Sequence, residues 1–218
     1  MFPRNGLILG VCALTFSTFS MGCNQGQMRM TQHEDMATPR ERADTRAAFP
    51  LVRQLDQEGL SRPIELDFDV PPQTSDPEPP VFIGVRVGAA DQTAAAEAAD
   101  RLLDAGISAR VRLYRLGGAV PEAIALSRSQ WTGRSDVQTV AVGDDGQVPG
   151  PFGTTADFVS MREAGLLLPD VNYQELEFVF IRDTPSGRYR AVVELRDPSG
   201  TLLAEKAELL IAYTAKSR

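Results

Sequence analysis

The chain has 218 residues, of which 43% are hydrophobic and 23% are charged, and its formal net charge at pH 7 is −7. This length and composition are typical of one folded domain with some additional sequence outside it. Because an acidic chain repels the phosphate backbone, the net charge argues against nucleic acid as a partner.

The first 22 residues have the pattern of a bacterial export signal. Arg4 is the only charged residue before Cys23, and the apolar run GLILGVCALTFSTF between them is too short for a membrane-spanning helix. Ser20 and Gly22 place small residues at positions −3 and −1 before the cysteine. The pattern predicts a lipoprotein signal peptide over residues 1–22, with lipidation of Cys23. Simple secretion and an uncleaved membrane anchor are the alternatives.

Residues 23–48 contain no regularly spaced large aliphatic residues, which predicts a flexible tether before a folded domain at 49–218. Both cysteines, Cys12 and Cys23, precede this domain, and the only histidine, His33, lies in the tether. The predicted domain therefore has no disulfide, no His-based metal site and no Ser–His–Asp triad. We expect it to hold no metal and no cofactor.

The sequence of the first half of the domain predicts four strands and one helix. Apolar residues alternate with charged or polar ones in IELDFDV and ISARVRLYRL, so one face of each strand is expected to be buried. The helix has Asp91 as its N-cap, carries alanines and Leu102 at helical spacing, and ends at Gly106. The expected strands are residues 49–56, 64–70, 81–88 and 107–116.

The middle of the domain is less regular. The stretch AVPEAIALSRSQW fits either a short helix or an edge strand, and VQTVAVG predicts a short strand. Thr154 or Thr155 is expected to be the N-cap of another short helix. The expected elements are a helix or edge strand over 119–131, a strand over 137–143, a loop over 143–153 and a helix over 154–165.

The C-terminal part predicts three long strands separated by Pro-Ser-Gly turns at 185–187 and 198–200. Proline fixes φ and glycine accepts positive φ, which suits tight turns. Such short connections predict antiparallel neighbours, and the last two strands are expected to form a hairpin with Val193 and Leu209 pointing into the core. The expected bounds are residues 173–183, 188–197 and 201–215.

Several strands separated by turn residues predict a mainly β fold. The specific expectation is an antiparallel β-sandwich with one or two short inserted helices, preceded by the signal peptide and the flexible tether.

Two acidic stretches are candidate sites. Glu65, Asp67 and Asp69 share one strand face and could act as the paired carboxylates of a hydrolase, although any strand with alternating charge has the same spacing. The sequence DDG at 144–146 resembles part of a calcium loop but lacks the remaining ligands. A solvated strand face and a turn are the simpler interpretations.

Trp131, the only tryptophan, lies between Arg128 and Arg134 in SRSQWTGRSD. An aromatic residue beside basic residues in a loop is a common anchor for protein contacts, and a place in the core is the alternative. These three residues are the candidate contact site.

The lipidation site, the strands PIELDFDVP and VFIGVRV, and the C-terminal SGRYRAVVELRD follow one another in the sequence. Together they resemble proteobacterial envelope lipoproteins with an immunoglobulin-like β-sandwich domain of unknown function. The C-terminal part of this resemblance rests on Gly187, Tyr189, Leu195 and Asp197. The resemblance as a whole covers residues 49–214. It implies a binding role, one form of which is immunity to a toxin delivered by type VI secretion, and it transfers no catalytic residue.

We therefore predict a lipid-anchored, non-catalytic protein-binding module at the bacterial cell envelope. Its expected partners are the lipid bilayer, through acylated Cys23, and an envelope or toxin protein. The expected location is the periplasmic face of the outer membrane, because Asn24 rather than aspartate follows the cysteine. The alternative function is a periplasmic hydrolase that uses surface carboxylates, and the alternative locations are the inner membrane and secretion.

Overall fold

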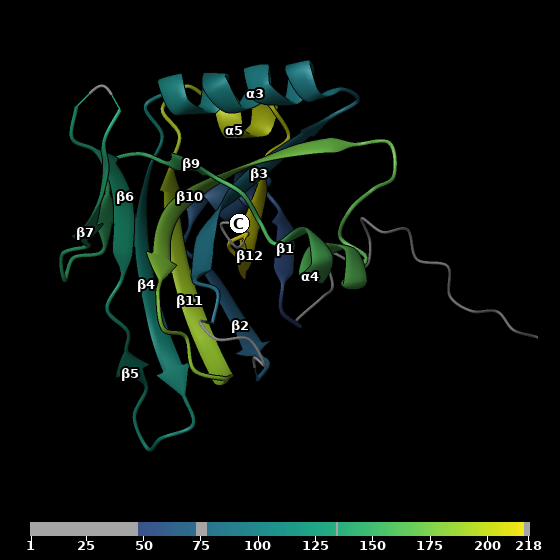
Figure 1. Cartoon of the computed structure of the whole chain (residues 1–218). Coiled ribbons are helices and arrows are strands. Elements are labelled where there is room, and N and C mark those ends of the chain that lie inside the picture. Colours follow the sequence, from purple (N-terminus) through teal and green to yellow (C-terminus); the bar gives the residue numbers. More distant parts are fainter. Residues whose placement is uncertain (1–47, 73–77, 134, 216–218) are drawn as a thin grey trace, which may run out of the picture. The chain divides into compact units, whose positions relative to one another are not determined.

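A computed structural model describes residues 48–72, 78–133 and 135–215 (Figure 1). The predicted signal peptide, Cys23, nearly all of the tether and Arg134 lie outside these residues. Most of the described chain lies in two antiparallel sheets whose inner faces form a shared core. The chain is therefore a mainly β protein, and the predicted antiparallel β-sandwich with short helices is confirmed.

The smaller sheet contains β2 (Ile64–Val70), β4 (Ser108–Leu116), β5 (Glu122–Ala123), β8 (Gln147–Val148) and β11 (Gly187–Arg196). Its order is β2-β11-β4-β5, and β8 pairs with the beginning of β4. In the centre of this sheet, Val193 of β11 lies opposite Val111 of β4. Because β5 and β8 are short, the outer edge of β4 is covered only near its two ends.

The larger sheet contains β1 (Leu51–Gln54), β3 (Val81–Ala89), β6 (Ser127–Trp131), β7 (Val137–Ala141), β9 (Phe152–Thr154), β10 (Asn172–Ile181) and β12 (Glu208–Tyr213). Its order is β1-β12-β3-β10-β6-β7, with β9 also paired to β10. β9 lies opposite Glu175 to Glu177, and β6 meets β10 at Phe180. β6 and β9 therefore share one edge of β10, separated by a β-bulge near Glu177.

The main core lies between the sheets and follows the alternation expected from the sequence. In β2, Phe68 and its apolar neighbours point inward, whereas Glu65 and Asp69 are exposed. The ring of Phe68 stacks 5.9 Å from that of Tyr189, which belongs to the same sheet. Burial of large apolar and aromatic side chains is the dominant stabilising term in such a core.

The larger sheet also has a covered outer face. Phe82 and Leu210 are fully buried there, under Met161 and Leu166 from α4 (Phe158–Glu163) and the segment that follows it. β3 is accordingly buried on both faces over most of its length. Its continuous apolar sequence VFIGV is typical of a strand in this position.

Two helices cross one end of the sandwich (Figure 1). They are α3 (Gln92–Asp104) and α5 (Thr201–Ala204), and a third short helix, α2 (Gln57–Ser61), follows β1. Leu102 of α3 is buried in the main core, and Arg101 donates hydrogen bonds of 2.7 and 3.0 Å to Glu205 beyond α5. The predicted N-cap is confirmed, because the Asp91 carboxylate accepts a 2.9 Å hydrogen bond from the Ala94 N–H.

The predicted C-terminal hairpin is wrong. β11 belongs to the smaller sheet, whereas β10 and β12 belong to the larger one, so both Pro-Ser-Gly turns connect the two sheets. The second connection contains α5 because the Asp197 carboxylate accepts hydrogen bonds from the N–H groups of Thr201 and Leu202, at 3.0 and 2.8 Å. Val193 and Leu209 do point into the core, but from opposite sheets.

The middle of the domain also differs from the prediction. Residues 119–131 contain β5 and β6, so the strand alternative is correct there and the helix alternative is wrong. The predicted loop at 143–153 includes β8 and the beginning of β9. The N-cap of α4 is Asp157, whose carboxylate accepts a 2.8 Å hydrogen bond from Ser160 N–H. Thr154 is the last residue of β9, so pairing with β10 removes it from the role of N-cap.

Candidate functional site

The hairpin formed by β6 and β7 carries two exposed large apolar side chains at one end of the larger sheet. It extends the sheet beyond β10, and β7 is the last strand on that side (Figure 1). Trp131 lies opposite Val137, and Ser129 lies opposite Thr139. Trp131 is thus the final residue of β6, in agreement with the strand alternative predicted for residues 119–131 and not with a position in a loop.

Trp131 and Val137 form an exposed apolar pair. Their exposed fractions are 57% and 50%. The backbone bonds between the strands run from Thr132 N–H to Asp136 C=O and from Val142 N–H to Leu126 C=O. Because hydrogen-bonded and non-hydrogen-bonded pairs alternate along the hairpin, Trp131 and Val137 are a non-hydrogen-bonded pair. In such pairs the opposed side chains lie closest together.

Phe152 of β9 extends this apolar pair toward the body of the domain. Its ring centroid is 5.2 Å from that of Trp131. We call Trp131, Val137 and Phe152 the hairpin patch. Of the two sequence interpretations of Trp131, the structure supports a surface position and excludes a place in the core.

The outer edge of β7 presents free backbone groups. Along β7, the even-numbered residues form the backbone hydrogen bonds to β6, as the bonds of the flanking Asp136 and Val142 show. The N–H and C=O groups of the odd-numbered Val137, Thr139 and Ala141 therefore point away from β6. Within the described parts of the chain, no strand pairs with this edge. β7 also contains no charged residue and no proline.

The structure does not bring the predicted arginines together with Trp131. Arg128 lies on the opposite face of the hairpin, where it donates a 2.6 Å hydrogen bond to Gln130. Arg134 lies outside the described residues. Another arginine that the sequence analysis missed, Arg182, follows β10 and donates a 2.8 Å hydrogen bond to the Thr139 hydroxyl. Since Thr139 shares the face of Trp131 and Val137, Arg182 supplies the positive charge beside the hairpin patch.

A buried carboxylate holds the hairpin in place. Glu177 is 4% exposed and sits where β6 and β9 meet β10. Its carboxylate accepts a 2.6 Å hydrogen bond from the Ser129 hydroxyl. Burial raises the pKa of Glu177, and the hydrogen bonds from Ser129 and Thr154 partly oppose this effect.

A second group of charges lies on the same covered face. Arg86 is 2% exposed, forms a 2.8 Å ion pair with Glu208 and donates a 2.9 Å hydrogen bond to the Leu166 carbonyl. Its guanidinium lies 4.2 Å from the centre of the Tyr173 ring. Burial raises the pKa of Glu175, and the charge of Arg86 acts against this increase. These contacts fasten the outer layer to the sheet, which is a structural role.

The acidic face of β2 is an ion-pair surface. Asp67 accepts hydrogen bonds from Arg190, at 2.7 and 3.0 Å, and from Arg188, at 3.2 Å. The hydrogen bond from Arg190 lowers the pKa of Asp67, although burial of the carboxyl opposes this shift. Glu65 and Asp69 are exposed on either side. Asp67 therefore stays ionised at neutral pH and has no proton to donate as a general acid.

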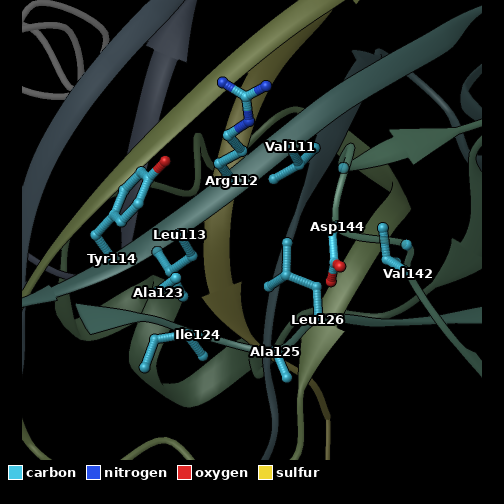
Figure 2. A pocket seen from close by; sticks show the side chains of 12 residues that line it. Val111, Arg112, Leu113, Tyr114, Ala123, Ile124, Ala125, Leu126, Val142 and Asp144 are labelled. Atoms are coloured by element: carbon cyan, nitrogen blue, oxygen red, sulfur yellow. The ribbon is translucent and has the colours of Figure 1, made fainter. Parts of the chain in front are cut away.

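A pocket of about 510 Å³ opens at the seam between the sheets, beside the uncovered part of β4 (Figure 2). The segments 123–126 and 142–146 cross between the sheets here, and Arg112 points away from Leu126 in Figure 2. This seam pocket adjoins the base of the hairpin. Its lining is mainly apolar and includes Val111, Leu113, Ile124, Leu126 and Val142, with Asp144 as a carboxylate.

The DDG sequence forms a turn beside this pocket. Gly146 N–H donates a 2.8 Å hydrogen bond to the Gly143 carbonyl, and Gly146 has a φ of 71°. Across the described residues, no cluster of three or more His, Cys, Asp or Glu side chains is arranged to hold a metal ion. In the same part of the chain, no helix has the length and apolar character needed to cross a membrane.

Comparison with known proteins finds no matching family model, no similar curated protein and no similar solved structure. The fold itself defines the class, an antiparallel β-sandwich of two packed sheets. This agrees with the β-sandwich part of the resemblance noted in the sequence, and no family is identified.

Proposed function

We propose that this protein is a non-catalytic binding module of the bacterial cell envelope, which contacts a partner protein through the β6–β7 hairpin. The observation that carries the proposal is the exposed pair Trp131–Val137. Tryptophan is enriched among residues that dominate the energy of protein interfaces, and an exposed apolar patch favours an interaction site. The seam pocket adds an apolar hollow at the base of the same hairpin.

The fixed position of the hairpin supports this role. Ser129 bonds to Glu177, Arg182 bonds to Thr139, and Trp131 packs against Phe152. A surface that is already ordered loses less conformational entropy when it binds. These contacts orient the patch before any partner arrives.

The lipid anchor is a separate part of the proposal. It is supported by Gly22-Cys23 after a short apolar segment, and it would hold the domain at the periplasmic face of the outer membrane. Replacement of Cys23 by serine is expected to abolish incorporation of labelled palmitate. Cys12→Ser is the matched control and should still be labelled. Equal labelling of both variants would contradict acylation at Cys23.

Site-specific photocross-linking in cells tests the contact surface. A benzoylphenylalanine at Val137 of the full chain is expected to give a discrete adduct with one envelope or toxin protein, and Trp131→Ala should abolish it. The control position is Glu65, which is exposed on the other sheet. Identical adducts from both positions, or none from Val137, would overturn the proposal. The identity of the adduct distinguishes toxin immunity from envelope assembly.

A further inference from the structure

We infer that the outer edge of β7 binds an extended segment of the partner as an additional strand of the larger sheet. This inference rests on the proposed binding function and specifies how the hairpin performs it. The N–H and C=O groups of Val137, Thr139 and Ala141 point outward and are available for such a ladder. Strand addition to an exposed sheet edge is a general mode of peptide recognition.

The other strands at the ends of the two sheets are protected against this kind of pairing. β1 follows Pro50 and contains Arg53, whereas β5 follows Pro121 and contains Glu122. β2 carries three carboxylates and lies between two prolines. Charges and prolines are the usual devices that prevent association at sheet edges. Of these end strands, β7 alone contains no charged residue and has no proline beside it, although Asp136 comes directly before it, so its edge can accept another strand.

The side chains beside this edge define the chemistry of the incoming segment. A residue placed opposite Thr139 on the patch face would lie next to Arg182, whose guanidinium already contacts the Thr139 hydroxyl. Within the described residues, Arg182 has no ion-pair partner. An acidic residue at this position would therefore gain a charged hydrogen-bond partner.

The next residue on the same face of the incoming strand is two positions away, opposite Val137. It would pack against Val137 and Trp131, which favours a large apolar side chain. For an antiparallel segment, the structure assigns an acidic residue at position i and a large apolar residue at i+2. The partner is thus an extended segment of another protein that carries this acidic residue.

A second copy of this chain fits the edge less well. Two β7 strands related by a two-fold axis through Thr139 would place both Arg182 guanidiniums beside that axis. Like charges in such close cross-strand positions repel each other. This repulsion is the reason for choosing an acidic partner segment over self-association.

Peptide binding to the full chain tests the inference, because Trp131 is the only tryptophan and its fluorescence reports directly on the site. The probe is the capped peptide TVTVETLTV, and the control peptide has lysine in place of glutamate. We expect saturable binding of the glutamate peptide and at least tenfold weaker binding of the lysine peptide. Arg182→Gln should remove most of this preference while leaving the circular dichroism spectrum unchanged.

Amide hydrogen exchange provides the second measurement. The peptide should slow exchange at Val137, Thr139 and Ala141, whose N–H groups point outward, and should leave Gln138, which is already bonded to β6, nearly unchanged. Unaltered exchange at the outward amides would overturn strand addition, as would equal binding of the two peptides. Concentration-dependent dimerisation that protects the same amides would assign the edge to a second copy. If cross-links from Val137 persist without this protection, the binding function stands and only the strand mode fails.

Discussion

The hydroxyl of Ser129 lies 2.6 Å from a carboxylate oxygen of Glu177, and this hydrogen bond joins the hairpin to β10. The backbone pairing between β6 and β10 is confined to Phe180 and Ser127. A short backbone ladder cannot by itself fix the direction of a projecting hairpin. The buried carboxylate therefore helps to fix how the hairpin patch is presented, together with the Arg182–Thr139 bond and the Trp131–Phe152 contact.

Ser129→Ala should loosen the hairpin. The change removes a hydroxyl donor from a buried carboxylate, and the expected loss in the free energy of unfolding is about 1.5–3 kcal/mol. Trp131 fluorescence should also shift toward that of a more solvated indole. Ser127→Ala is the control in the same strand, with an expected effect within about 0.5 kcal/mol. Equal losses from the two variants would show that Ser129 has no special role.

Glu177→Gln tests the buried carboxyl through the pH dependence of stability. Burial raises the folded-state pKa of Glu177 above its ordinary value, so the folded state holds the proton more tightly than the unfolded state. Stability from this group is therefore present at acidic pH and is lost as pH rises through the raised pKa. Denaturant titrations from pH 4 to 8 should show that the glutamine variant loses less stability over this range than the wild type. A variant with the same pH slope as the wild type would contradict this assignment.

Asp67→Asn should produce the opposite pH dependence. The hydrogen bond from Arg190 lowers the folded-state pKa of Asp67, so its stabilising effect is present above the ordinary value and is lost as pH falls. The difference in stability between wild type and variant is expected to shrink in acid and in high salt. Asp69→Asn, two residues further along the same face of the strand and more exposed, is the control. A difference that grows in acid would exclude the ion pair as its cause.

Gly84→Ala should destabilise the larger sheet at the bulge. A Cβ at this position would lie 1.9 Å from the Leu176 carbonyl oxygen and 2.8 Å from Glu177 Cα, so the backbone must move. Overpacking of this kind costs about 1–3 kcal/mol. At Gly153, a Cβ would meet no heavy atom within 4 Å, and Gly153→Ala serves as the control. Thermal unfolding of both variants measures the difference, and similar melting temperatures would contradict the predicted clash.

Leu209→Ala should show the contribution of the main core. Leu209 is fully buried in β12, and truncation of such a leucine costs about 2–5 kcal/mol. Leu103, which is 41% exposed on α3, provides the comparison, with an expected loss below about 1 kcal/mol. Denaturant midpoints measure both, and equal losses would show that Leu209 is not held in a close-packed core.

Local sequence patterns were enough to predict the secondary structure of much of the domain. Alternation in IELDFDV placed Phe68 inside and Glu65 outside, because side chains of a strand point to opposite faces in turn. Asp91 and Gly106 marked the ends of α3 through local capping and positive φ. The absence of cysteine and histidine from residues 49–218 is also a property of the sequence alone.

Long-range contacts decide which strands are neighbours and which faces of the sheets are covered. The turn residues at 198–200 are compatible both with a hairpin and with a connection between the two sheets. The structure has the connection between sheets, in which the Asp197 carboxylate accepts hydrogen bonds from the start of α5. Glu177 is 4% exposed and bonds to Ser129 because β6 and β9 meet β10 at this point, and these pairings are long-range.

The candidate site depends on long-range contacts in the same way. Arg128 is close to Trp131 in sequence but lies on the opposite face, because three residues along a strand reverse the side-chain direction. Arg182 is far away in sequence, yet the register of β6 and β7 beside β10 brings it to Thr139. The periodicity of apolar residues depends only on residues close in the sequence. Strand pairing and side-chain burial depend instead on which distant segments pack together with the lowest free energy. For this reason the sequence located Trp131 as a candidate, and the fold decided its neighbours.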